Sequence, residues 1–159
     1  MRFFGRILAA GAALPAALIA SSVAAQSLSA ADPEGLVAAL QSLGYRATLT
    51  TDGEGDPKIE SATGGVTFHL YFYGCDDAHL GCTGLQLSAG FDQPTPMTAS
   101  DANKWNFDNL FGEMTVDDEG DPRLSYFFTT DGGLNHDTFA DILDWWEVAL
   151  GQFLDYIDW

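Results

Sequence analysis

The sequence predicts an α+β domain in which helices pack on an antiparallel sheet, in the order α-β-β-β-β-α-β-β-α. Three observations support this fold class. Apolar residues recur at helical spacing near both ends of the folded chain. Between these ends, apolar and polar residues alternate in short runs, which is the pattern of half-buried strands. Turn-forming Gly, Asp and Pro residues separate the runs.

The first helix is predicted to begin after Asp32, which can cap its N-terminus, with Pro33 in the first turn. Gly44 is a typical helix stop and ends the pattern. The expected apolar face consists of Leu36, Val37, Leu40 and Leu43.

Four strands are predicted after this helix, at 45–50, 58–63, 66–73 and 85–91. A Gly-Gly turn at 64–65 separates the second from the third. The third is the clearest, because large apolar and polar residues alternate along its whole length. Its expected core-facing residues are Val66, Phe68, Leu70 and Phe72.

The chain is expected to leave the sheet at Pro94 and Pro96, because proline cannot donate a hydrogen bond to a neighbouring strand. A second helix is predicted from 98 to 110, with Ser100 as its cap. Its expected buried residues include Trp105 and Leu110.

Two further strands are predicted near 113–117 and 124–130, and a long helix follows, capped by Asn135 or Asp137. Its expected inward stripe is Phe139, Ile142, Leu143, Trp146, Leu150, Phe153 and Ile157. A second, weaker apolar line runs beside this stripe and could mark a subunit interface or cap the rim of the sheet. That line consists of Trp145, Val148, Tyr156 and Trp159.

The N-terminus has the features of a secretory signal peptide. Arg2 and Arg6 precede an apolar run at 7–20, and small residues follow at the expected cleavage site. We therefore expect residues 1–25 to be removed and residues 26–159 to form one domain in the periplasm or outside the cell. An uncleaved anchor is the alternative, but the run is shorter than the roughly 20 residues that span a bilayer.

The expected mature chain is strongly acidic. Without Arg2 and Arg6 it has four Lys and Arg residues against 23 Asp and Glu residues, a net charge of −19. Such a surface repels phosphate backbones and anionic headgroups, so nucleic-acid and membrane binding are disfavoured. Solubility is the simplest role of this charge, and steering of basic partners is a second one.

Two acidic segments, TDGEGDPKIES and VDDEGDPRLSY, repeat a Gly-Asp-Pro pattern. Neither has the glycine at the sixth position and the glutamate at the twelfth that an EF-hand loop requires. Gly-Asp-Pro between two alternating runs favours a hairpin turn, with calcium binding as the alternative. The residues concerned are Gly55, Asp56, Pro57, Gly120, Asp121 and Pro122.

Cys75 and Cys82 are the two cysteines of the chain and lie at the ends of a short loop. An even number of cysteines in an exported protein favours a disulfide, which would contribute about 2.5 kcal/mol by closing this loop. The alternative is a zinc site in which His79 joins both thiols, with Asp76 or Asp77 as a fourth ligand.

The sequence contains no G-x-S-x-G, H-E-x-x-H or apolar carboxylate-pair motif. His69 lies on the polar side of a predicted strand and His136 in a helix cap, where structural roles are the default. We therefore predict no enzymatic activity and no cofactor, with a hydrolase lacking these motifs as a further alternative.

Several segments together resemble one known family. They are GYRATLTTDGEGDPKI, FYGC, CTGLQLSAGF, NKWNFDNLFGEMTVDDEGDPRLSY and the final helix around FADILDWWEVALGQF. In this order they resemble the YbjN-domain family, described as bacterial sensory transduction regulators, over nearly all of the mature chain.

The resemblance implies a small, acidic, usually dimeric α+β protein with a fold similar to class I type III secretion chaperones and no catalytic residues. It marks the two Gly-Asp-Pro turns together with Asn103, Trp105 and Asn106 as family-marking or binding candidates. Taken on their own, Trp105 is expected to anchor the core, and both asparagines to bond backbone near a sheet edge. We predict a non-enzymatic, chaperone-like or regulatory module that binds an unknown protein partner and forms a homodimer.

Overall fold

The computed structural model describes residues 27–159, so the predicted signal peptide at 1–25 lies outside the described residues. The order of elements is the one predicted from the sequence. The helices are α1 (Pro33–Ser42), α2 (Ala99–Asp108) and α3 (His136–Ile157). The strands are β1 (Arg46–Thr51), β2 (Pro57–Thr63), β3 (Val66–Tyr73), β4 (Gly84–Gly90), β5 (Glu113–Val116) and β6 (Pro122–Thr129).

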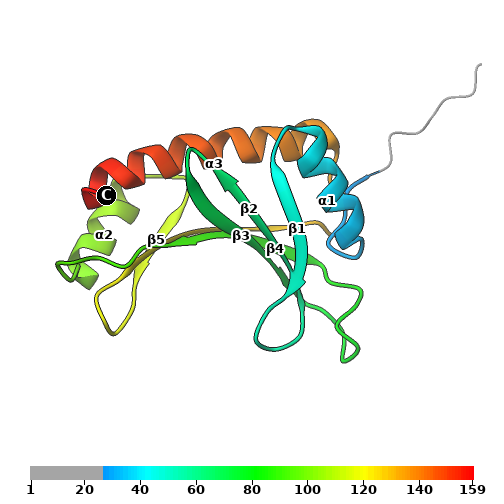
Figure 1. Cartoon of the computed structure of the whole chain (residues 1–159), viewed down its shortest axis with the longest axis horizontal. Coiled ribbons are helices and arrows are strands. Elements are labelled where there is room, and N and C mark those ends of the chain that lie inside the picture. Colours follow the sequence, from blue (N-terminus) through cyan, green and yellow to red (C-terminus); the bar gives the residue numbers. More distant parts are fainter. Residues whose placement is uncertain (1–26) are drawn as a thin grey trace, which may run out of the picture.

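The six strands form one antiparallel sheet in the order β1-β2-β3-β4-β6-β5. Figure 1 shows α3 over one side of this sheet. The helix α1 lies near the start of α3, and α2 lies near the end of α3. Buried residues of all three helices belong to one hydrophobic core with the strands. In residues 27–159 no helix covers the other side, which we call the open face.

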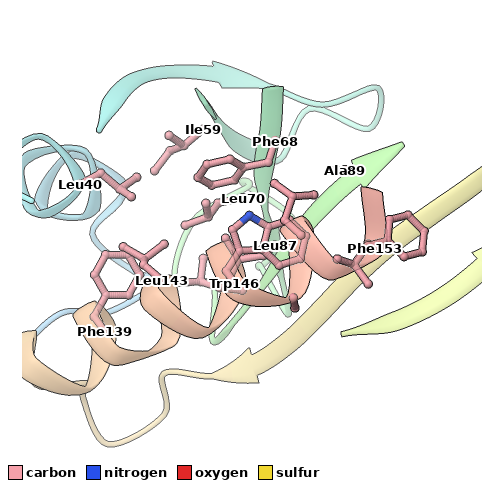
Figure 2. Close-up of a cluster of buried hydrophobic side chains, with 14 of the residues drawn as sticks. Leu40, Ile59, Phe68, Leu70, Leu87, Ala89, Phe139, Leu143, Trp146 and Phe153 are labelled. Atoms are coloured by element: carbon pink, nitrogen blue, oxygen red, sulfur yellow. The ribbon is translucent and has the colours of Figure 1, made fainter. Parts of the chain in front are cut away.

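The core is centred on α3 and β3 (Figure 2). Trp146 is fully buried, and its ring centre lies 5.9 Å from that of Phe68. Phe153 lies two turns further along α3, and its ring centre is 5.0 Å from that of Trp105 in α2. Leu40 of α1 lies on the other side of the same cluster in Figure 2, so one core holds all three helices. The predicted alternation of β3 and the predicted stripe of α3 are confirmed by this packing.

A helix followed by a hairpin occurs twice in the fold. The unit α1-β1-β2 occupies one edge of the sheet and the unit α2-β5-β6 occupies the other. Each hairpin bends at one of the two Gly-Asp-Pro turns, with the edge strand first and the inner strand second. The repeated sequence therefore corresponds to a repeated piece of architecture, with the two turns at opposite ends of the sheet.

Two predictions about α2 were wrong. Its N-cap is Thr98, whose side chain and that of Asp101 form a reciprocal capping box, and not Ser100. The helix ends at Asp108, because Asn109 adopts an extended conformation, so Leu110 lies beyond the helix and is fully exposed instead of buried. The predicted caps Asp32 and Asn135 are both confirmed. Among residues 27–159, no helix has the length and hydrophobicity of a membrane span.

Candidate functional site

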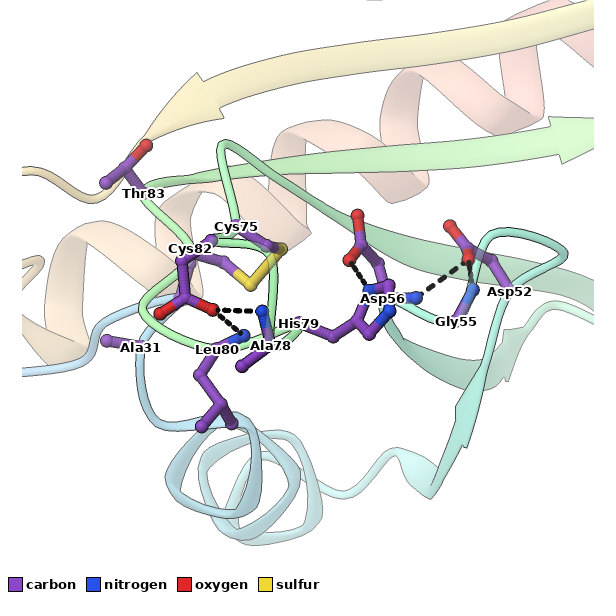
Figure 3. The surroundings of a disulfide bond; sticks show 12 residues. Ala31, Asp52, Gly55, Asp56, Cys75, Ala78, His79, Leu80, Cys82 and Thr83 are labelled. Carbon is purple, nitrogen blue, oxygen red and sulfur yellow. Dashed lines mark hydrogen bonds and ion pairs between the residues drawn. A yellow bond between two sulfur atoms is a disulfide. The ribbon is translucent and has the colours of Figure 1, made fainter.

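The first acidic turn, between β1 and β2, is stabilised by hydrogen bonds among its own residues (Figure 3). The N–H of Asp52 donates to the carbonyl of Asp56 at 2.9 Å and closes the hairpin. Oδ1 of Asp52 accepts the N–H groups of Glu54, Gly55 and Asp56 at 2.9–3.0 Å. Gly55 has a φ of +101°, a conformation that glycine adopts without strain. This carboxylate oxygen therefore stabilises the turn.

The second turn repeats this geometry. The N–H of Asp117 donates to the carbonyl of Asp121 at 3.1 Å, and Oδ1 of Asp117 accepts the N–H groups of Glu119 and Asp121. These bonds, chiefly the one from Asp121, hold the pKa of Asp117 below its usual value, because they favour the charged carboxylate. Gly120 has a φ of +89°. The hairpin interpretation of both segments is what the geometry supports.

The aspartate that precedes the proline in each turn joins the hairpin to a neighbouring segment. Oδ1 of Asp56 accepts from Nδ1 of His79 at 2.7 Å, which ties the β1–β2 turn to the loop after β3. Oδ1 of Asp121 accepts from the backbone N–H of Gln93, also at 2.7 Å, which ties the β5–β6 turn to the segment after β4. Both turns are thus anchored at two points.

Cys75 and Cys82 are joined by a disulfide that closes the loop between β3 and β4 (Figure 3). Oδ1 of Asp76 accepts the N–H groups of Ala78 and Leu80 at 2.9 and 3.0 Å. The two cysteines and the histidine of the alternative zinc site are thus engaged in other contacts, since the two sulfurs bond each other and Nδ1 of His79 faces Asp56. Residues 27–159 contain no cluster of three His, Cys, Asp or Glu side chains placed to hold a metal ion.

The Asn-Lys-Trp-Asn segment attaches α2 to the edge strand β5. The indole N–H of Trp105 donates to the carbonyl of Gly112 at 2.9 Å in a buried position. The side-chain amide of Asn106 donates to the carbonyl of Met114 and accepts its N–H, at 3.1 and 2.8 Å. Asn106 thus pairs with β5 as a further strand would. Asn103 is exposed, and its side chain makes no hydrogen bond within the described residues.

The two histidines considered for catalysis lie far apart in the fold. His69 of β3 lies on the open face, 3.9 Å from Glu60. Its pKa is lowered from the usual value, first by burial and then by the charge of Lys58. His136 is the first residue of α3 and is exposed.

An apolar groove lies between the α2–β5 loop and α3, and we call it the α2–α3 groove. Its volume is about 470 Å³. Leu110 is fully exposed at its rim, and Trp145 and Val148 of α3 are 53% and 49% exposed. Phe111 forms part of its wall and stacks on Tyr126 of β6, with ring centres 3.9 Å apart. The other lining residues are Asp108, Asn109, Ala149 and Gln152.

The second apolar line of α3 thus divides into two parts. Tyr156 packs on Trp105, with ring centres 5.3 Å apart, and Trp159 packs on Phe91 at 5.0 Å. These two residues fasten the end of the helix to the domain. Trp145 and Val148 stay exposed and form the groove with Leu110 and Phe111, which sequence reasoning missed because it placed Leu110 in the core.

The structure does not gather the predicted site residues at one place. The two Gly-Asp-Pro turns lie at opposite ends of the sheet, and the Asn-Lys-Trp-Asn segment lies beside β5. Each of them stabilises the fold locally. In the α2–α3 groove, by contrast, three exposed apolar side chains from two segments gather on one surface, namely Leu110, Trp145 and Val148.

Comparison with known proteins gives one match. The model of a family named YbjN, described as "Putative bacterial sensory transduction regulator", matches residues 32–159. No curated protein and no solved structure matches the chain.

The role of Asn106 can be tested by comparison with Asn103. Replacing Asn106 by Ala removes both partners of the Met114 backbone, and we expect a loss of about 1–3 kcal/mol in the free energy of unfolding. Asn103→Ala removes no hydrogen bond and should change this free energy by less than about 0.5 kcal/mol. Urea denaturation followed by tryptophan fluorescence measures both, and equal effects would contradict the edge-capping role.

The Asp117 turn predicts a pH dependence. Because its folded pKa lies below the unfolded value, Asp117 contributes stability above about pH 4, and this contribution is lost as the pH falls through the folded pKa. Asp117→Asn does not titrate, so its urea midpoint should fall less than that of the wild type between about pH 5 and 2. Asp118→Asn, at an exposed neighbour, is the control and should follow the wild type.

Proposed function

The chain belongs to the YbjN family, and from this premise we propose that it acts as a regulator that binds a protein and catalyses no reaction. The observation that supports a binding role is the α2–α3 groove. It combines fully or half-exposed Leu110, Trp145 and Val148 with a stacked aromatic wall on the rigid body of the domain. Exposed apolar clusters of this kind mark protein interaction sites.

The chemistry of the groove also indicates the kind of partner. Its floor and rim accept apolar side chains, and aromatic anchors such as Trp145 contribute most to binding when a partner excludes water from them. Asp108 lines the groove, and Asp141 lies exposed on α3 one turn before Trp145. We propose a partner segment with apolar side chains flanked by Lys or Arg, because the acids would attract it.

We further propose that this activity takes place after export. The signal-peptide pattern of residues 1–25 supports export, and a disulfide between Cys75 and Cys82 is compatible with an oxidising compartment. A regulator in the periplasm has no direct access to cytoplasmic proteins. A chaperone-like or sensory role toward another exported protein therefore suits this chain better than direct control inside the cell.

We do not propose metal binding as a second function. The turn aspartates Asp52 and Asp117 each give one oxygen to several backbone N–H groups, and the cysteine sulfurs bond each other. The disulfide occupies both sulfurs that a zinc site would need, and Oδ1 of each turn aspartate already accepts backbone N–H groups.

Export can be tested by fractionation of cells that express the full chain. We expect the protein in the periplasm or the medium, with a mass that corresponds to a start at Gln26 and with no free thiol. A cytoplasmic protein that keeps residues 1–25, or one with two free thiols, would contradict the proposal.

Groove binding can be tested with the mature protein immobilised as bait. Trp145→Ser combined with Val148→Ser should abolish capture of a protein that the wild type retains from a periplasmic extract, because the apolar anchors are lost. Phe107→Ser is the matched control, since Phe107 is 90% exposed but does not line the groove. If both variants capture equally, or if the wild type captures nothing, the groove is not the binding site.

A further inference from the structure

The two edges of the sheet differ in how they are protected. At the β5 edge, the Asn106 side chain occupies the N–H and carbonyl of Met114, and β5 has only four residues. The β1 edge is six residues long and contains no proline and no lysine, two of the features that commonly block exposed edges. Within residues 27–159 the charge of Arg46 and one contact from the Gln41 side chain are what this edge has instead, and an edge of this length is a template for pairing with another strand.

Alternate residues of β1 direct their backbone N–H and carbonyl groups either toward β2 or away from the sheet. Asp52 donates to Asp56 across the hairpin, so Asp52 and every second residue before it bond toward β2. Ala47, Leu49 and Thr51 therefore direct their N–H and carbonyl groups away from the sheet. Within residues 27–159, Ala47 alone among them has a recorded partner, the exposed Gln41 side chain at 3.3 Å from its carbonyl.

We propose that this edge binds the β1 edge of a second copy of the chain, antiparallel, with the two-fold axis at Leu49. In this register Leu49 lies opposite Leu49 of the second copy, and Ala47 lies opposite Thr51. All three outward residues of each copy then form pairs, which gives six N–H···O bonds by antiparallel geometry. The two sheets join into one of twelve strands.

The side chains of β1 are complementary to themselves in this register. On the open face, Arg46 lies opposite Asp52 of the second copy and Thr48 lies opposite Thr50, and the symmetry repeats both pairs. Opposite charges and Thr–Thr pairs are favourable cross-strand neighbours. On the helix side, the half-buried Leu49 side chains meet at the axis. This self-complementarity identifies a second copy as the occupant.

The neighbouring symmetric registers are poorer. With the two-fold axis at Thr48, Arg46 lies opposite Thr50 of the second copy and has no charged partner there. With the axis at Thr50, Arg46 lies opposite Glu54 of the second copy, which is beyond the end of β1. Each of these registers pairs only two of the three outward residues within the strand. The Leu49 axis is therefore the register that satisfies most backbone groups. A single pair of short strands is a small interface, so the dimer forms reversibly and depends on concentration.

Cysteine cross-linking tests the register directly. Thr48 and Thr50 are exposed on the open face, and the native cysteines already bond each other. Opposite residues of a non-hydrogen-bonded pair lie about 4.5 Å apart between Cα atoms, within disulfide range. Copies of Thr48 itself are offset by two residues and lie more than about 7 Å apart, which a disulfide does not bridge.

A mixture of Thr48→Cys and Thr50→Cys proteins should form a disulfide-linked heterodimer under mild oxidation. Each variant alone should form on the order of tenfold less linked dimer. Equal cross-linking in all three samples, or none in the mixture, would overturn the proposal.

Light scattering over a range of concentrations provides the second readout. We expect the wild type to form dimers. Thr51→Pro removes an outward N–H that has no recorded partner within residues 27–159, and it should give a monomer with an unchanged circular dichroism spectrum. Arg46→Glu places a Glu opposite Asp52 and should weaken the dimer without a change in fold. A wild type that stays monomeric, or a dimer unaffected by both variants, would overturn the proposal.

This inference is independent of the α2–α3 groove. The groove variant Trp145→Ser with Val148→Ser should leave cross-linking unchanged, and Arg46→Glu should leave partner capture by the groove unchanged. Failure of one proposal is therefore distinguishable from failure of the other.

Discussion

The structure depends on one layer of helices covering one face of a six-stranded sheet. Trp146 and Phe153 of α3 fill the space above the central strands, and burial of each such side chain contributes on the order of 1.5–3 kcal/mol. Because there is a single layer, the sequence must also keep one face and two edges compatible with water. The open face does this with exposed polar residues such as Glu60, Thr67 and Glu113, which alternate with the core residues of the same strands.

The acidic residues of this chain serve the fold mainly through backbone contacts. Asp52 and Asp117 accept several N–H groups each, and Asp32 and Asp101 take part in helix caps. A turn that brings several N–H groups together has a positive local potential, so a carboxylate is a better acceptor there than a neutral side chain. In both turns the backbone thus supplies the positive ends of dipoles to the carboxylate.

Local sequence patterns predict the order of the helices and strands. Contacts between segments that are distant in the sequence cannot be predicted in this way. The alternation of β3 and the apolar stripe of α3 are confirmed, because each depends only on the spacing at which apolar residues recur in the sequence. The Thr98–Asp101 capping box can be recognised in the sequence from the spacing of its two side chains, but Ser100 nearby also has a side chain that can cap a helix. By contrast, Leu110 has helical spacing and was misplaced because α2 ends early, and the groove it forms with Trp145 joins segments 35 residues apart. The pairing of Asn106 with Met114 likewise requires knowing that β5 is an edge.

The distribution of charge separates the two proposed surfaces. Of the four Lys and Arg residues in the described chain, Arg46, Lys58 and Arg123 point to the open face, where the strands contribute only the acids Glu60 and Glu113. Asp52, at the end of β1, adds one acid on the same side as Arg46, and Lys104 is the fourth basic residue. Two copies that approach through β1 therefore meet beside a face that carries three of the four basic residues, which reduces the repulsion between two acidic chains. Two α2–α3 grooves would instead bring acidic rims together, which disfavours self-association there and leaves the groove open to a basic partner.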